Sequence, residues 1–181
     1  VGGFVSVVRT DVLQGVMMLL GSAVIFYFVT QAAGGVTSIS ALRAMPEKQF
    51  LFELNGGIPF AVLLGVSLSG SLKLLSDPRQ LSRFYALKDE AAVRRGKWIA
   101  TLGLAIVLSC LFPVGIYTHL ILPEVTDTDL IVPSLVSDPS VFPLWASDFL
   151  IIAILAAAMS SMDSVLLVAA CLLYTSDAAD E

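Results

Sequence analysis

The chain has 181 residues, of which 57% are hydrophobic and only 14% are charged, and its mean hydropathy is +0.89. A soluble domain is nearer half apolar and a quarter charged, so a single soluble core of this size would leave much apolar surface in water. The net charge of −5 is small and the basic residues form no continuous stripe, which excludes a nucleic-acid partner from our expectations. The composition predicts an all-α, polytopic membrane protein that lies in a lipid bilayer.

Four mainly apolar stretches are each close to the length of a transmembrane helix, which needs about 20 residues. Each stretch is far longer than a typical β-strand, and none shows the alternation of a half-buried strand. The sequence therefore predicts four transmembrane helices, at about residues 8–34, 54–75, 94–120 and 144–170.

The basic residues indicate how these helices are oriented. Six of them lie between the apolar parts of the second and third spans: Arg79, Arg83, Lys88, Arg94, Arg95 and Lys97. The connection between the third and fourth spans holds no Lys or Arg. By the positive-inside rule the first of these connections is cytoplasmic and the second is outside. We expect a multi-pass protein of the cell inner (cytoplasmic) membrane.

Among the charged residues within or next to the apolar stretches, three stand out as candidates: Asp11, Lys73 and Asp163. A charged side chain at the centre of a bilayer costs about 2.5–3.5 kcal/mol on insertion scales, so such residues are candidates for a functional role. Simpler interpretations remain open for two of them. Asp11 suits the positive end of a helix dipole, and Lys73 can reach the membrane surface or pair with Asp77.

The fourth span carries a polar stripe beside Asp163. The stripe consists of Ala157, Ser160, Ser161 and Ser164, spaced i, i+3, i+4 and i+7, so its members share one helix face. Hydroxyl, carbonyl and carboxylate oxygens are the ligands that hard cations prefer, and sodium is such a cation. The alternative is that these small residues only allow another helix to approach closely. The neighbouring carboxylate of Asp163 favours an ion site.

Three segments carry a family resemblance. Gly2-Gly3-Phe4 with Thr10-Asp11-Val12-Leu13-Gln14 resembles a "GG…TD…Q" helix. The segment from Asp77 to Phe84, followed by Ala92 to Gly96, is similar to a "QP…RF…A…RRG" cytoplasmic segment. Leu155 to Val168 is similar to a "LAA.MST.DSQLLV" helix. All three motifs, in this order, are typical of the sodium:solute symporter family.

The resemblance implies a LeuT-like inverted-repeat core, in which the four spans are the fifth to eighth core helices. It implies a sodium (Na+) site formed by the carbonyl of Ala157 and the hydroxyls of Ser160 and Ser161. It further implies a possible second Na+ or proton site formed by four residues: Asp11, Ser160, Asp163 and Ser164. Members of the family often carry Ser at the position of Asp163, so this chain would have one more carboxylate at the second site than those members have.

Lys73 occupies a position that faces the substrate in this family and is often aromatic. A lysine there makes a sugar a poor candidate and favours a solute that carries a carboxylate. The resemblance thus predicts sodium-coupled symport of a small organic solute by alternating access, with a carboxylate, a vitamin or an amino acid favoured. The alternatives are a symporter-like sensory domain of a signalling kinase and a helical membrane scaffold that transports nothing. No nucleophile–base constellation supports an enzyme.

Both ends of the chain lead to further expectations. The chain begins without Met and enters its first apolar run almost at once, so we expect residues 1–170 to be an internal part of a symporter's transmembrane domain. Residues 171–181 read CLLYTSDAADE, which resembles the translation of a common sequencing adaptor. We therefore predict that this tail is not part of the natural protein.

Overall fold

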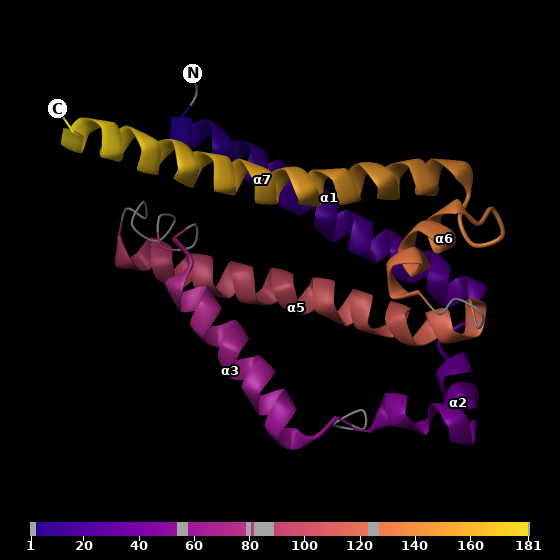
Figure 1. Cartoon of the computed structure of the whole chain (residues 1–181). Coiled ribbons are helices and arrows are strands. Elements are labelled where there is room, and N and C mark those ends of the chain that lie inside the picture. The colour runs from indigo at the N-terminus through magenta and orange to yellow at the C-terminus, as the bar shows by residue number, and fades with distance from the viewer. Residues whose placement is uncertain (1–2, 54–57, 79–80, 82–88, 123–126, 181) are drawn as a thin grey trace.

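The computed structural model describes residues 3–53, 58–78, 81, 89–122 and 127–180, and every regular element within them is helical (Figure 1). The elements are α1 (Gly3–Ala32), α2 (Ser38–Arg43), η1 (Pro46–Phe52), α3 (Phe60–Ser76), α5 (Glu90–Ile121), η2 (Thr128–Leu130), α6 (Ile131–Ser137) and α7 (Leu144–Asp180). The described part of the chain is all-α, which confirms the predicted class.

Three of the described helices are long and apolar enough to cross a membrane, over Val5–Ala32, Glu90–Ile121 and Leu144–Tyr174. They coincide with the first, third and fourth predicted spans. The second predicted span coincides with α3, which has 17 residues. At 1.5 Å per residue, α3 is about 26 Å long, slightly less than the hydrocarbon thickness of about 30 Å. Residues 54–57, where this span was predicted to begin, lie outside the described residues.

Local sequence explains where two of the long helices begin or end. The carboxylate of Asp89 accepts a hydrogen bond from the backbone N–H of Ala92 at 2.7 Å, which caps the first turn of α5. α1 is followed by Gly34 and Gly35, whose φ angles are +91° and +92°. Glycine adopts this left-handed conformation at no steric cost, so the pair turns the chain out of α1.

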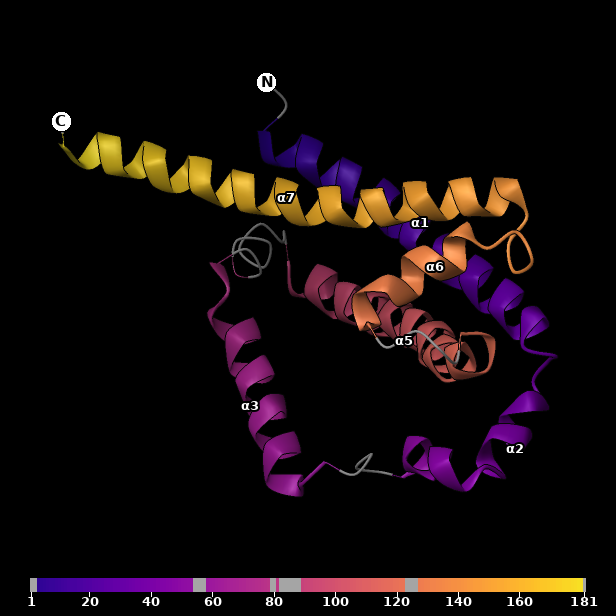
Figure 2. The same ribbon diagram turned by 45° about the vertical axis from the view of Figure 1, so that its right-hand side comes forward.

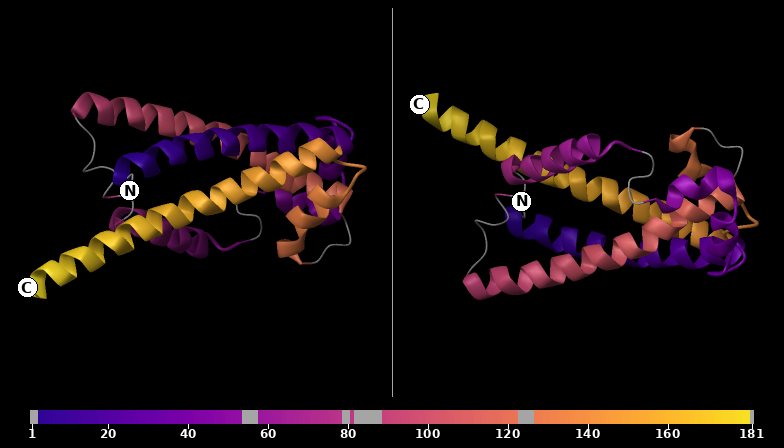
Figure 3. Two further views of the ribbon diagram at one scale, coloured as in Figure 1. Left: turned by 90° about the horizontal axis from the view of Figure 1, so that it is seen from above. Right: turned by 90° about the horizontal axis from the view of Figure 1, so that it is seen from below.

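α1 lies between the other two long helices, packed against α5 and α7 (Figures 1 and 2). Figure 3 shows that α1 and α7 run in opposite directions, and the two helices cross in the view of Figure 1. The start of α1, the start of α5 and the end of α7 lie at one end of the molecule, and α2 and α6 lie at the other (Figure 1). Arg9 and the described basic residues of α5 (Arg94, Arg95 and Lys97) are therefore at the same end. By the positive-inside rule, this end of the molecule corresponds to the predicted cytoplasmic side.

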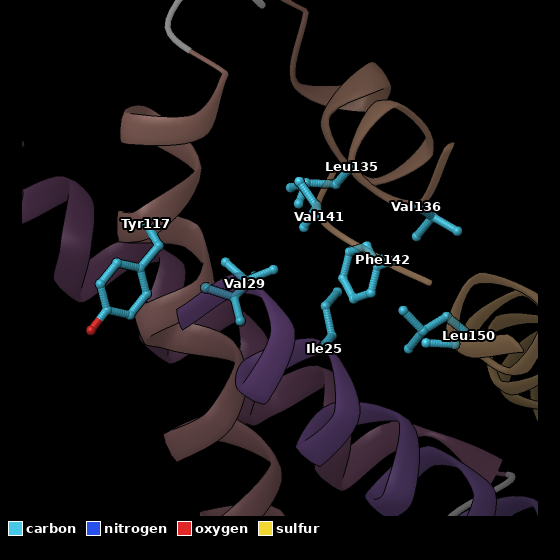
Figure 4. Close-up of a cluster of buried hydrophobic side chains, with 10 residues drawn as sticks. Ile25, Val29, Tyr117, Leu135, Val136, Val141, Phe142 and Leu150 are labelled. Atoms are coloured by element: carbon cyan, nitrogen blue, oxygen red, sulfur yellow. The ribbon is translucent and has the colours of Figure 1, made fainter. Parts of the chain in front are cut away.

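The hydrophobic core lies at the end of the molecule that holds α6 (Figure 4). Its buried side chains come from α1, α5, α6, the turn before α7, and α7: Ile25, Val29, Val114, Tyr117, Leu135, Val136, Val141, Phe142, Ala146 and Leu150. The rings of Phe28 and Phe142 lie 5.7 Å apart, and both contribute to this cluster. α6 lies in the predicted outer connection, so the core lies at the predicted outer end of the three long helices.

Outside this core, large apolar side chains of the long helices are exposed. Examples are Leu102 and Phe112 on α5 and Leu155 and Leu166 on α7, each of which is at least 57% exposed. In the apolar windows of α5 and α7 only 6% of the residues are buried by the rest of the chain. Such surfaces fit lipid or further helices rather than water.

Parts of the predicted pattern fall where the chain is not described. Most of the motif from Asp77 to Phe84 lies outside the described residues, as do three of the basic residues used for the orientation: Arg79, Arg83 and Lys88. α7 continues past residue 170 to Asp180, so the helix includes most of the tail. The origin of residues 171–181 remains a prediction.

Candidate functional site

A hydrogen bond joins two of the predicted site residues across the α1–α7 junction. The hydroxyl Oγ of Ser160 on α7 donates to the carboxylate Oδ1 of Asp11 on α1, at 2.8 Å. Both residues are partly buried. An ionised carboxylate has only acceptors, and this bond satisfies one of them. The hydroxyl donates its single proton and keeps its two lone pairs, which remain available to a cation.

The α1–α7 junction is held close by a small residue. A Cβ atom added to Gly21 would lie 2.9 Å from the Cβ of Ala153, which is closer than such atoms approach in proteins. Gly21 follows Asp11 by 10 positions along α1, which is about 15 Å. The two helices thus meet closely at Gly21 and Ala153, and Asp11 meets Ser160 about three turns nearer the N-terminal end of α1.

Gln14 is a residue of this junction to which the sequence analysis assigned no role. It follows Asp11 by three positions, and so lies one turn further along the same face of α1. Its side chain is 9% exposed, and its Oε1 atom is buried without a hydrogen-bond partner. Buried acceptors are nearly always paired in native structures. The signal was in the sequence, because Gln14 is a polar residue inside an apolar run and part of the "TD…Q" motif.

The other hydroxyls of the predicted stripe bond to their own helix. Ser161 Oγ donates to the carbonyl of Ala157 at 3.3 Å, and Ser164 Oγ donates to the carbonyl of Ser160 at 2.9 Å. Such bonds to the preceding turn are common for Ser within helices. Ser161 is exposed, whereas Ala157 and Ser164 are partly buried. The sequence spacing thus brings these residues together on α7, and Asp11 of α1 joins them through its hydrogen bond from Ser160.

Asp163 is also on α7 and is partly buried. Within the described part of the chain, no hydrogen bond joins it to Asp11 or to Ser160. The two carboxylates of the predicted second site are therefore not linked directly.

A cavity of about 260 Å³ lies next to the polar junction, between α1, α5, α6 and α7. Its lining is apolar apart from one hydroxyl: Met18, Gly21, Ser22, Ile25, Val107, Leu111, Val132, Val136, Leu150, Ala153, Ile154 and Ala157. The hydroxyl of Ser22 donates to the carbonyl of Leu19 at 2.8 Å, so it is already paired. Ala157 therefore borders both this apolar cavity and the polar stripe.

Lys73 lies elsewhere. It is an exposed residue of α3 and lines an open cavity of about 500 Å³ between the end of α3 and the later part of α7. The α7 residues of this cavity are Val165, Val168, Ala169 and Leu172. They follow Ser160 along α7, so the structure does not bring Lys73 to the Asp11–Ser160 pair. Lys73 lies in the last turn of α3.

The oxygen atoms at the junction are of the kind that binds hard cations. Among the described residues, no group of three or more His, Cys, Asp or Glu side chains is placed to hold a metal ion. A cation at this junction would therefore need hydroxyl, amide or main-chain oxygens beside the carboxylate of Asp11. Oxygen ligands of this kind fit the hard cations.

Three long apolar helices and a polar junction between two of them define a multi-pass helical membrane protein. The model of the sodium:solute symporter family matches residues 1–177, and the chain belongs to that family. Proteins of this family are transporters and not enzymes. The motifs from the first to the last span thus identified the family correctly.

Two curated proteins are similar to the chain. It is 28% identical over 169 residues to a sodium/pantothenate symporter of Haemophilus influenzae, and 27% identical over 168 residues to a sodium/pantothenate symporter of Escherichia coli. Each alignment covers 92% of this chain and 34% of the relative. The chain therefore spans about a third of the length of these relatives. No solved structure matches it.

Proposed function

We propose that the chain is part of a symporter that couples the entry of sodium to the uptake of a small organic solute across the cytoplasmic membrane. The observation that carries the proposal is the hydrogen bond from Ser160 to Asp11. It places a carboxylate and a hydroxyl, both predicted ion ligands, at one junction between two membrane-length helices. The family match and the sodium/pantothenate symporters among the relatives support sodium as the coupling ion.

The four predicted spans are, in this proposal, four consecutive helices of a LeuT-like inverted-repeat core. α3 is the second of them. In such cores the substrate and ion sites lie near the bilayer midplane, where helices of the two repeats meet. The α1–α7 junction would be part of that meeting point.

Sodium would bind at two neighbouring places on α7. One set of ligands is the carbonyl of Ala157 with the hydroxyls of Ser160 and Ser161. The other, for sodium or a proton, combines Asp11 with Ser160, Asp163 and Ser164. Ser160 belongs to both sets, and its bond to Asp11 supports the second. Occupation of these places would hold α7 in the state that binds solute, and release of the ion inside would free the solute.

The solute is a small carboxylate, a vitamin or an amino acid. Pantothenate is a candidate because the relatives are sodium/pantothenate symporters. Lys73 adds support, since it lines a cavity at the predicted inner end of α3 and carries a positive charge that attracts anions. No observation favours the sensory-domain or scaffold alternatives.

The test uses the full-length protein that contains this chain, reconstituted in liposomes. Uptake of labelled pantothenate, other carboxylates, amino acids and sugars is measured with sodium or choline outside, at several pH values. Ser160→Ala and Ser161→Ala should each raise the sodium concentration that gives half-maximal uptake by about tenfold or more, because a hydroxyl bound to a charged group contributes about 1.5–3 kcal/mol.

Ser71→Ala is the matched control. Ser71 also donates to the preceding turn of its own helix, at 2.8 Å to the carbonyl of Ser67, but it lies on α3. This variant should keep the sodium dependence of the unaltered protein. Uptake that does not need sodium, or an unchanged sodium dependence in both α7 variants, would overturn the proposal.

A further inference from the structure

A cavity with a mainly polar lining lies in the connection between α1 and α3, on the predicted outer side. Its volume is about 310 Å³, and it is lined by Arg43, Gln49, Phe52 and Glu53. Arg43 is in the last turn of α2, whereas Gln49 and Phe52 belong to η1. α2 lies at the opposite end of the molecule from the start of α1 (Figures 1 and 2).

The fold holds the base of the Arg43 side chain in place. Leu42, the preceding residue, is fully buried, and α2 packs against both η1 and α5. The turn into α2 is also constrained, because a Cβ atom on Gly34 would lie only 2.9 Å from the hydroxyl Oγ of Ser38. Arg43 itself is exposed. Its charge is therefore presented to the solvent from a fixed position.

The side chains of the cavity offer three different kinds of contact. Among the described residues, no ion pair or hydrogen bond joins Arg43 to Glu53. The guanidinium of Arg43 can thus hold a carboxylate through two parallel hydrogen bonds. The carboxylate of Glu53 only accepts hydrogen bonds, so it suits a hydroxyl, amide N–H or ammonium group. The ring of the partly buried Phe52 offers an apolar surface between them.

The other predicted outer connection would repel an anion. Between α5 and α7 the sequence has four acidic residues and no Lys or Arg: Glu124, Asp127, Asp129 and Asp138. The connection between α1 and α3 instead balances two basic residues against two acidic ones: Arg43, Lys48, Glu47 and Glu53. An anion that approaches from outside is therefore attracted to the connection that contains the cavity, because surface charge raises the local concentration of oppositely charged solutes.

We propose that this cavity is an outer entry site for the solute, a small monocarboxylate with hydrogen-bond donors away from its carboxylate. Arg43 binds the carboxylate and Glu53 accepts from the donors. Glu53 also repels a second carboxylate, so the site selects against dicarboxylates. This inference rests on the proposed function, because it names the chemistry of the transported solute. The chain continues from Glu53 toward α3, which begins at Phe60 and carries Lys73 in its last turn.

The experiment uses the full-length symporter in liposomes, with labelled pantothenate as the probe and saturating sodium. Arg43→Gln should raise the KM for pantothenate by about three- to tenfold, as expected for a charged contact that stays open to solvent. The maximal rate should stay within about twofold, because the site acts before translocation. The sodium concentration for half-maximal uptake should not change, since no proposed ion ligand is altered. Arg43→Lys should fall between the two proteins, because lysine keeps the charge without the planar pair of donors.

Lys97→Gln is the matched control. It removes the same charge from an exposed residue of α5, at the predicted cytoplasmic end. This variant should keep the KM of the unaltered protein. Added choline chloride should raise the KM of the unaltered protein and of Lys97→Gln, but should change that of Arg43→Gln less, because salt screens the attraction of the anion to Arg43.

A second variant tests the role of Glu53 in selecting the solute. Glu53→Gln keeps the size of the side chain and removes its negative charge. Glutarate, a dicarboxylate, should then inhibit pantothenate uptake at a concentration about three- to tenfold lower than in the unaltered protein, because the repulsion of its second carboxylate is lost. Lys97→Gln should leave inhibition by glutarate unchanged.

The outcomes separate this inference from the proposed function. If Arg43→Gln and Lys97→Gln have the same KM for pantothenate while uptake still needs sodium, the entry site is wrong and sodium-coupled symport stands. If Arg43→Gln does not fold, unchanged inhibition by glutarate in Glu53→Gln overturns the entry site equally. Sodium-dependent uptake of sugars without uptake of any carboxylate would do the same. Uptake that does not need sodium would instead remove the proposed function.

Discussion

Ser160 of α7 donates a hydrogen bond to Asp11 of α1 across 149 positions of the chain, at 2.8 Å. The same two helices approach closely at Gly21 and Ala153. A polar contact and a close contact of small residues therefore hold one junction. In a membrane, where lipid competes equally for apolar side chains, contacts of these two kinds are what hold helices together.

The first prediction concerns the coupling between Asp11 and Ser160. In sodium-free buffer, Asp11→Ala and Ser160→Ala should each lower the free energy of unfolding of the full-length protein in detergent. The double variant should lose less than the sum of the two, by about 0.5–3 kcal/mol, because both single changes remove the same hydrogen bond. Chemical unfolding of the four proteins measures the difference.

The control is a second double-mutant cycle, in which Asp11→Ala is combined with Ser71→Ala instead of Ser160→Ala. Ser71 lies on α3 and bonds within its own helix. The effects of Asp11→Ala and Ser71→Ala should add to within about 0.3–0.5 kcal/mol, as is usual for residues without shared partners. Additive effects for Asp11 and Ser160 as well would show that the hydrogen bond does not contribute to stability.

A second prediction concerns the close approach of α1 and α7. Gly21→Ala should lower the unfolding free energy by about 1–3 kcal/mol, because the new methyl group would lie against the Cβ of Ala153 at 2.9 Å. Gly15→Ala should instead raise it by up to about 1 kcal/mol, since nothing lies within 4 Å of its Cβ position and alanine is the better helix former.

A second substitution, Ala153→Gly, tests whether the contact between residues 21 and 153 causes the loss of stability in Gly21→Ala. Ala153→Gly removes the methyl group that Gly21→Ala would meet, so the double variant should regain much of the lost stability. A Gly21→Ala protein that is as stable as Gly15→Ala, with no response to Ala153→Gly, would contradict the close approach. Thermal unfolding in detergent is a sufficient measurement for all four proteins.

The sequence predicted the long helices well, because an apolar run of membrane length has few other structures available. Their ends were predicted less well. The third span was predicted to begin near residue 94, but α5 begins at Glu90, where Asp89 caps its first turn. Hydropathy detects only the part of a helix that lies in lipid. Charged first turns are helical for a different reason, the capping of free backbone N–H groups.

Part of the candidate site could also be predicted from the sequence, because polar residues stand out in apolar stretches. Asp11 and Ser160 were candidates because a charge or a run of hydroxyls in an apolar stretch is unusual, and the family motifs placed both in one site. Gln14 was missed because α1 is apolar on nearly all sides, so periodicity does not show which face meets α7. Its burial depends on the register of α1 against α7, and that register is a property of the folded structure.

A third prediction concerns the outer core. Phe142 is 1% exposed and packs among Ile25, Leu150 and the ring of Phe28 (Figure 4). Phe142→Ala should lower the unfolding free energy by about 3–5 kcal/mol, the usual loss for a buried phenylalanine. Leu144→Ala is the control, because Leu144 is two positions away and 80% exposed. Similar stabilities of the two variants in chemical unfolding would contradict the placement of Phe142 in the core.

The last prediction concerns the turn from Asp138 to Val141, just before Phe142. This turn lies outside the membrane-length helices. The carboxylate of Asp138 accepts hydrogen bonds from the hydroxyl of Ser140 at 2.7 Å and from its backbone N–H at 2.9 Å. These bonds favour the charged form and hold the pKa of Asp138 below its ordinary value of 3.8, with the hydroxyl of Ser140 as the larger cause. The backbone carbonyl of Asp138 also accepts from Val141 and Phe142, so the turn leads directly into the core.

Because the pKa of Asp138 is lower in the folded turn than in the unfolded chain, the folded turn binds fewer protons at acidic pH. Its contribution to stability is therefore complete above the unfolded pKa and is lost as the pH falls through the folded pKa. Ser140→Ala should move the pKa of Asp138 up toward its ordinary value, and Ser140→Thr should keep it low because the hydroxyl remains. Carboxyl ¹³C NMR titration of the three proteins between neutral pH and about pH 2 measures the shift, within the range where carboxyl groups titrate. Identical titrations of Asp138 in the unaltered and Ser140→Ala proteins would show that the hydroxyl does not determine its charge, and the link between this turn and acid stability would then be lost.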